Sequence, residues 1–160
     1  MRFRSNHIRR RRDGRYEVRL SDPERQLLKA LPSQILDLIA SGDPSSNRLF
    51  PPAYGAEGDE NANAEYRQLT RESLLAHHRE ALTLLASTAD VQDLDAEQAE
   101  EWLCALNDAR LVLGTRLEVG EDAAPLVPDD PRTPGMAMYH WLTWLQDQLV
   151  DAMAAGLPTS

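Results

Sequence analysis

The sequence predicts a mainly α fold, with about five helices around one central helix and an N-terminal β-hairpin. Residues 95–119 predict the central helix, because their apolar side chains recur at helical spacing around nearly the whole circumference. A helix of this kind is usually buried by neighbours on several sides. Residues 6–20 predict the hairpin, because polar and apolar side chains alternate next to a strong turn signal. The length of 160 residues and the hydrophobic content of 42% fit a single domain, residues 1–160.

The turn of the hairpin lies at Asp13-Gly14, and two strand registers are open. A two-residue loop would pair Arg9 with Val18. A three-residue loop would pair Ile8 with Val18 and place Gly14 in the left-handed conformation of a bulge. We favour the second register, because it gathers the apolar side chains of the hairpin on one face: Ile8, Tyr16, Val18 and Leu20.

A capping box, Ser21 with Glu24, starts the first helix, which Pro32 interrupts without a change in its apolar register. We expect one kinked helix that runs to about Ser41 and is ended by Gly42. Residues 43–64 form an irregular, proline-rich segment anchored by three apolar side chains: Leu49, Phe50 and Tyr54.

Two further helices are expected before the central one, at about 62–69 and at 71–87, with Thr70 as the cap between them. Asp95 and Gln98 form a capping box at the start of the central helix. Gly114 within that helix indicates close approach of another backbone. The last helix is expected at about 136–155.

The net charge of −9 hides an asymmetry. Residues 1–20 carry eight arginines against Asp13 and Glu17, a net of +6, so the other 140 residues carry nine basic and 24 acidic side chains, a net of −15. The hairpin therefore contains a candidate nucleic-acid-binding patch: Arg9, Arg10, Arg11, Arg12 and Arg15. The acidic body would repel a polyanion, so a solvated arm or an intermolecular salt contact with the acidic body is favoured over DNA.

Cys104 is the single cysteine, so an intramolecular disulfide is excluded. A redox sensor needs a thiolate near cations, whereas the helical neighbours of Cys104 include Glu100, Glu101 and Asp108. A small packing residue is the favoured interpretation, and Cys104 stays a redox candidate.

Four polar residues lie on the central helix: Asn107, Asp108, Arg110 and Arg116. We favour a buried hydrogen-bond network that fixes the helix register, with Arg110 reaching a carboxylate on another segment. A pocket for an anion is the alternative.

Metal, cofactor and catalytic patterns are weak in this sequence. The adjacent His77 and His78 point about 100° apart on a helix and do not easily share one ion, so we expect no metal site. Motifs for phosphate binding or for nucleophilic catalysis are missing from the sequence, and we expect neither a cofactor nor an enzyme.

Trp144 falls on the polar side of the last helix, where an aromatic side chain is typical of an interface anchor. A two-stranded hairpin also leaves two open strand edges. Together these features suggest a homodimer through the last helix, the hairpin edge, or both. The alternative is that Trp144 packs under the segment 43–64 or the segment 120–135.

Three segments carry a resemblance to a known family: RLFPPAY at residues 48–54, the tryptophan and LNDARLVLGTRL run within 102–117, and WLTWLQ at 141–146. They resemble an actinobacterial family of unknown function that includes AosR-type oxidative-stress transcriptional regulators, over about residues 14–155. The resemblance implies a cytoplasmic protein encoded near the ClpS protease adaptor, and it carries no catalytic residues. A sensing mechanism with two cysteines does not transfer, because this chain has only Cys104.

The expected function is a non-enzymatic regulatory or adaptor role in stress-linked transcription, exerted through protein contacts with RNA polymerase or a sigma factor. The alternative is direct nucleic-acid binding through the arginine-rich hairpin. The sequence contains no apolar run close to the ~20 residues that span a bilayer, so we expect no membrane contact and a cytoplasmic location.

Overall fold

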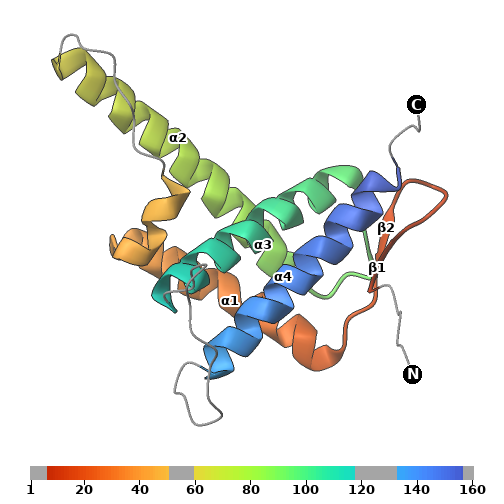
Figure 1. Ribbon diagram of the computed structural model, residues 1–160. Coiled ribbons are helices and arrows are strands. Elements are labelled where there is room, and N and C mark those ends of the chain that lie inside the picture. Colours follow the sequence, from red (N-terminus) through yellow and green to blue (C-terminus); the bar gives the residue numbers. More distant parts are fainter. Residues whose placement is uncertain (1–6, 51–59, 118–132, 157–160) are drawn as a thin grey trace.

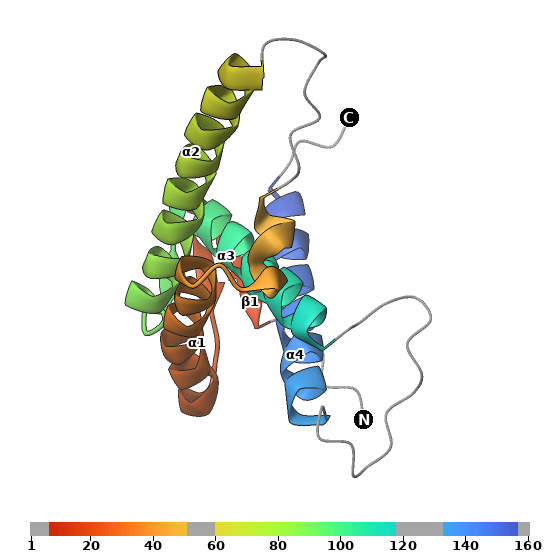
Figure 2. The ribbon, with the colours of Figure 1, turned by 90° about the vertical axis from the view of Figure 1, so that its left-hand side faces the viewer.

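The computed structural model of the protein describes residues 7–50, 60–117 and 133–156, with side chains from residue 64 onward in the second range. Its elements follow the chain in the order β1 (Ile8–Arg10), β2 (Tyr16–Val18), α1 (Asp22–Ala40), the 3-10 helix η1 (Pro44–Leu49), α2 (Glu60–Ser87), β3 (Asp93–Leu94), α3 (Ala96–Arg116) and α4 (Thr133–Ala154). The predicted mainly α fold is confirmed (Figure 1). In Figure 2, α1 and α2 lie on one side of α3, and α4 lies on the other.

The helix α3 is the centre of the fold, as its sequence predicts. It packs against α1, η1, α2 and α4. The capping box is present, since the Asp95 carboxylate accepts from the Gln98 backbone N–H at 2.8 Å and the Gln98 side chain accepts from the Asp95 N–H. Trp102 is fully buried, while Leu111 and Leu113 are part-buried and pack against the core from different faces. The helix ends at Arg116 with Leu117 as its C-cap, so the predicted end at residue 119 is wrong by three residues, of which 118 and 119 lie outside the described residues.

The hairpin adopts the favoured register, with Ile8 opposite Val18 and Arg10 opposite Tyr16. Gly14 has a φ of 87°, the left-handed conformation that the three-residue loop requires. The expectation of two open strand edges is wrong, because β2 also pairs with β3 through Tyr16 opposite Leu94. A two-residue strand is too short to show the alternation of apolar and polar side chains by which a strand is predicted from sequence.

Arg25 in the first turn of α1 joins the small sheet to the helices. Its guanidinium donates to four backbone carbonyls: Val18 at 3.0 Å, Leu20 at 3.3 Å, Ala89 at 2.9 Å and Val91 at 2.8 Å. These carbonyls come from the end of the hairpin and from the α2–β3 connection. One cation thus holds together two segments that are more than 60 residues apart in sequence.

The start of α1 contains the predicted capping box of Ser21 and Glu24. The second carboxylate oxygen of Glu24 accepts from the Trp141 indole N–H at 2.9 Å, so this cap also fixes α4 against α1. Pro32 lies inside a continuous helix and is buried, as the uninterrupted apolar register indicates.

We expect Glu24→Gln to lose less stability than the wild type does when the pH falls. Burial raises the pKa of the Glu24 carboxyl, but the hydrogen bonds from Ser21 and Trp141 outweigh burial and hold it below its ordinary value of 4.5. A group with a depressed folded pKa contributes stability above its unfolded pKa, and this contribution is lost as the pH falls through the folded pKa. Urea unfolding at about pH 7 and about pH 3 should therefore show a smaller difference for Glu24→Gln than for the wild type. Equal differences for the two proteins would contradict the prediction.

The predicted break at Thr70 is wrong, because α2 is one continuous helix from Glu60 to Ser87. A threonine inside a helix costs only a few tenths of a kcal/mol, which the neighbouring turns easily offset. The N-terminal part of α2 extends beyond the other helices (Figure 1). The fifth helix of the described part is instead η1, whose Leu49 is buried together with Phe50. Tyr54, the third predicted anchor, lies outside the described residues.

Gly114 marks a close approach, although the neighbour is a side chain rather than the expected backbone. A Cβ at this position would lie 3.0 Å from the Tyr139 ring on α4. The helix α4 begins at Thr133, three residues before its predicted start. Among the described residues, no helix is both long enough and apolar enough to cross a membrane.

Candidate functional site

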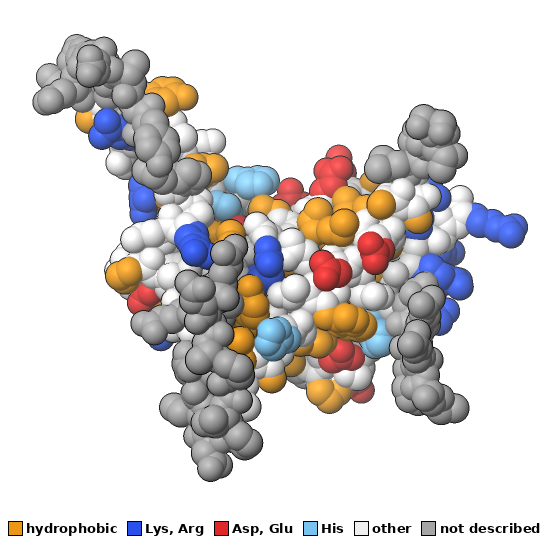
Figure 3. Space-filling view, in the orientation of Figure 1, with side chains coloured by type: hydrophobic (Ala, Val, Ile, Leu, Met, Phe, Trp, Pro, Cys, Tyr) orange, Lys and Arg blue, Asp and Glu red, His pale blue; other side chains and the backbone are white. Residues whose placement is uncertain are grey.

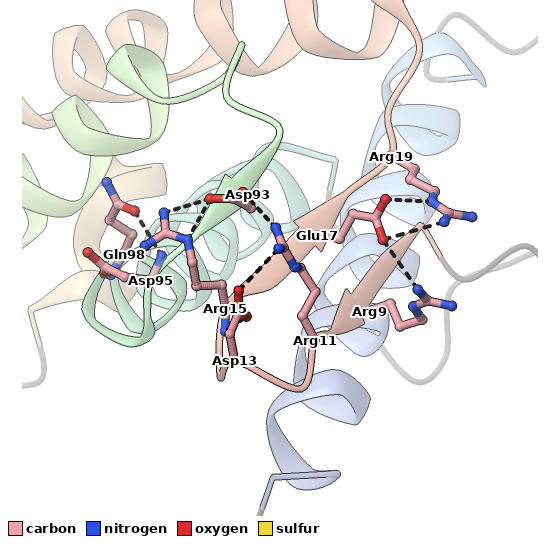
Figure 4. Close-up of polar contacts among 9 residues, drawn as sticks. All are labelled: Arg9, Arg11, Asp13, Arg15, Glu17, Arg19, Asp93, Asp95 and Gln98. Carbon is pink, nitrogen blue, oxygen red and sulfur yellow. Dashed lines mark hydrogen bonds and ion pairs between the residues drawn. The ribbon is translucent and has the colours of Figure 1, made fainter.

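The arginines of the hairpin face carboxylates on neighbouring strands (Figure 4). Arg15 Nε donates to Asp93 Oδ1 at 2.7 Å, and Arg11 donates to Asp93 Oδ2 at 3.0 Å. Arg11 also lies 3.1 Å from Asp13 in the turn. The sequence did not indicate Asp93 as a partner, because the pairing depends on β3 joining the sheet.

Glu17 on β2 contacts a second pair of arginines, one on β1 and one directly after β2. It lies 3.6 Å from Arg9 and 3.2 Å from Arg19. Arg10 and Arg12 are exposed, and neither makes an ion pair within the described part of the chain. The five arginines of the predicted patch are therefore not equivalent: Arg9, Arg11 and Arg15 are paired with carboxylates.

A second polar cluster lies where α2 packs against α3. His78 Nδ1 is 2.7 Å from Asp108 Oδ2, and both side chains are buried. His78 Nε2 donates to the Leu49 carbonyl at 3.0 Å. A carbonyl oxygen only accepts, so the proton on Nε2 is required. The hydrogen bond with Asp108 is the main cause that raises the pKa of His78, to about 10.

Cys104 is half-buried beside this pair. Its Sγ lies 3.4 Å from His77 Nε2 and 3.9 Å from Asp108 Oδ2. One ligand atom each from His78, Cys104 and Asp108 lies within 4.8 Å of the others. Nitrogen, sulfur and oxygen donors of this kind can hold a transition metal.

One signal for this cluster is present in the sequence, in the spacing of two residues on α3. Cys104 and Asp108 are four residues apart on α3, so they project from the same face of the helix. The carboxylates emphasised beside Cys104 lie on its own helix, whereas His77 and His78 come from the facing helix α2. Which residue of α2 meets which residue of α3 is decided by tertiary packing.

The predicted network of four polar residues on α3 is divided among three places. Asp108 belongs to the cluster with His78. Arg110 donates to Asn107 at 3.0 Å on the same helix, and its expected contact with a carboxylate of another segment is not seen among the described residues. Arg110 Nε is buried without a hydrogen-bond partner in the described ranges. Arg116 lies 3.4 Å from Asp43, the N-cap of η1, in an exposed position.

Trp144 on α4 has 36% of its surface exposed. The ring of His7 meets it edge-on, with the ring centroids 4.6 Å apart. The indole is thus partly covered by the residue that precedes β1, and most of the two loops expected to cover it lies outside the described residues.

The structure defines a mainly helical protein in which a short three-stranded sheet closes one end of the helix packing. The chain belongs to the family described as "Domain of unknown function (DUF2017)", whose model matches residues 3–153. It is 32% identical over 125 residues to the oxidative stress regulators AosR of Mycobacterium tuberculosis and Mycobacterium bovis. These matches cover 68% of this chain and 57% of the relatives, so the chain spans little more than half their length. No solved structure matches it significantly.

Proposed function

We propose that this chain is a non-enzymatic regulator of an oxidative stress response in the cytoplasm, and that it acts by binding another protein. The names of the mycobacterial relatives support the regulatory role. The proposal that it is not an enzyme is supported by His78, whose two ring nitrogens are both engaged, so it has no free nitrogen to serve as a general base.

The charge distribution supports a protein partner over DNA. Asp93 and Glu17 neutralise much of the arginine hairpin, and a guanidinium held by a carboxylate must break that contact before it binds a phosphate. The rest of the chain carries a net charge of −15, which opposes the approach of a polyanion.

The single observation that carries the proposal is an exposed apolar pair on the projecting part of α2. Tyr66 is 68% exposed and Leu69 is 65% exposed. Hydrophobic side chains appear on this part of the surface in Figure 3. A large aromatic beside an aliphatic side chain on one helix is the kind of anchor that a protein partner buries. The partner class that we propose is RNA polymerase or a sigma factor.

Direct binding of purified components tests the proposal. We expect the full chain to bind RNA polymerase or one of its sigma factors, and Tyr66→Ala/Leu69→Ala to weaken this binding by about tenfold or more. Arg10→Ala/Arg12→Ala is the matched control, because it also removes two exposed side chains, and it should leave the affinity unchanged. Absence of binding to polymerase and to every sigma factor, or full affinity in the α2 variant, would refute the proposed mechanism.

Direct nucleic-acid binding is the second candidate function, and the exposed Arg10 and Arg12 favour it. If the hairpin contacts phosphates, the logarithm of the affinity for duplex DNA should fall steeply with the logarithm of salt concentration. Arg10→Ala/Arg12→Ala should then reduce that slope by about two. If the wild type and Arg10→Ala/Arg12→Ala bind DNA equally weakly, and salt concentration does not change that affinity, direct nucleic-acid binding is excluded.

The proposal includes a homodimer joined through α4. Trp144 retains 36% exposure beside His7, so a second copy would cover it. The pairing of β2 with β3 removes one of the two edges that first suggested a dimer. We expect light scattering at micromolar concentration to give the mass of a dimer, and Trp144→Ala to convert it to a monomer. A monomer mass for the wild type would contradict the dimer.

A further inference from the structure

The polar cluster of His78, Cys104 and Asp108 between α2 and α3 plays no part in the proposed binding of a partner through Tyr66 and Leu69. We propose that His78, Cys104 and Asp108 bind one Zn²⁺ ion, and that the neighbouring His77 supplies the fourth ligand. This site is separate from the exposed Tyr66 and Leu69, so the two proposals stand or fall independently.

The distances among His78, Cys104 and Asp108 suit one ion after small side-chain movements, whereas His77 contacts Cys104 alone and would have to turn toward the ion as its fourth ligand. Zn–ligand distances of ~2.0–2.3 Å place pairs of ligand atoms roughly 3.3–3.5 Å apart. Cys104 Sγ lies 3.4 Å from His77 Nε2 and 3.9 Å from Asp108 Oδ2. His78 Nδ1 and Asp108 Oδ2 are 2.7 Å apart, the length of a hydrogen bond, and this pair would open by about half an ångström around an ion.

Adjacent histidines can serve one ion here because Cys104 faces both of them from the other helix. The ring planes of His77 and His78 are tilted by 55° and their centroids are 5.9 Å apart. His77 presents Nε2 to the thiol, whereas His78 presents Nδ1 to the Asp108 carboxylate. The use of different ring nitrogens compensates for the divergence of the two side chains along α2.

The surroundings of His78 are those of a metal ligand. Histidines that bind a metal usually donate their other ring N–H to a carbonyl or carboxylate, which fixes the tautomer. His78 Nε2 donates to the Leu49 carbonyl at 3.0 Å, so Nδ1 is the nitrogen directed into the cluster. The buried end of η1 holds Leu49 in place.

Charge balance and donor type favour Zn²⁺ over a hard cation. A thiolate from Cys104 and a carboxylate from Asp108 neutralise the two positive charges, which lowers the cost of burying the ion. Thiolate and imidazole donors suit zinc, whereas Mg²⁺ and Ca²⁺ prefer oxygen. Asp108 is 2% exposed and Cys104 is half-buried, so the ion would enter from the side of Cys104 and the exposed His77.

The test uses the full chain, treated with a chelator and then titrated with Co²⁺ under thiol-reducing conditions. We expect one Co²⁺ per chain, with a thiolate-to-cobalt absorption band in the near ultraviolet and the intense visible bands of tetrahedral cobalt. One equivalent of Zn²⁺ should displace these bands. Zn²⁺ should also raise the Tm of the wild type, because it binds the folded state.

Two variants assign the ligands without disturbing the deepest part of the cluster. Cys104→Ser should abolish the near-ultraviolet band and weaken Zn²⁺ binding by at least tenfold, and His77→Gln should weaken it by a smaller factor. His140→Gln, which removes an exposed histidine on α4, is the matched control and should bind as the wild type does. Circular dichroism before titration checks that each variant is folded.

Three results would overturn the site. They are the absence of the cobalt bands in the folded wild type, retention of the near-ultraviolet band in Cys104→Ser, and an equal loss of binding in His140→Gln. The first would leave His78 and Asp108 as a buried ion pair between the helices.

Discussion

Trp102→Ala should destabilise the protein by about 3–5 kcal/mol, the range for removal of a large buried aromatic side chain. Trp102 is fully buried on α3, and its indole N–H donates to Thr88 Oγ1 at 2.7 Å. The substitution leaves a large cavity where the end of α2 meets α3. Urea unfolding followed by far-ultraviolet circular dichroism measures the change in the free energy of unfolding.

Trp102→Phe separates packing from the hydrogen bond. The Thr88 hydroxyl also donates to the Leu84 carbonyl at 2.6 Å, so it keeps one partner when the indole is lost. We expect this variant to lose roughly 1–2 kcal/mol, for one hydrogen bond and a smaller ring. A loss below about 1 kcal/mol for Trp102→Ala would contradict the burial of this side chain and the central position of α3.

Local signals predicted the starts of α1 and α3 and the register of the hairpin. The capping boxes at Ser21 and Asp95 depend on side chains three residues apart, so their chemistry is complete within one turn. The register follows from Gly14, because a three-residue loop with a left-handed glycine brings the apolar residues to one face. These features could be predicted because no distant segment is needed to form them.

Features that depend on tertiary packing could not be predicted. The strand β3 has two residues and forms only because β2 lies beside it. The pairing of His78 with Asp108 requires one particular alignment of α2 and α3 along their axes. The apolar faces of the two helices do not specify that alignment. The mistaken break at Thr70 has a different cause, since a capping residue is also tolerated inside a helix when the turns on both sides continue.

The match to the AosR relatives covers only part of their length. The chain spans little more than half of each curated AosR protein, so any activity that needs the remaining part of those proteins is a proposal for this chain. The described part contains an exposed apolar pair on α2 and a buried donor cluster on α2 and α3. Binding of a partner at the first and of an ion at the second can be measured independently.

Arg25→Ala should destabilise the protein by about 2–4 kcal/mol, which is the second largest expected effect. The guanidinium donates to four backbone carbonyls, and hydrogen bonds to a charged group contribute about 1.5–3 kcal/mol each when they act alone. The sum is smaller, because Arg25 is only part-buried and water can replace some of these donors.

Arg25→Ala should loosen the sheet and the α2–β3 connection in particular, in addition to lowering the free energy of unfolding of the whole protein. The carbonyls belong to Val18, Leu20, Ala89 and Val91, so the sheet and the α2–β3 connection lose their common contact. Hydrogen exchange should therefore accelerate first at the Val18 amide, which donates to the Gln92 carbonyl at 2.8 Å, and later in α3. Arg25→Lys is the matched control, because an ammonium keeps the charge but cannot span four carbonyls, and it should recover less than half of the lost stability. Full recovery by lysine would show that the charge alone is required and that the shape of the guanidinium is not.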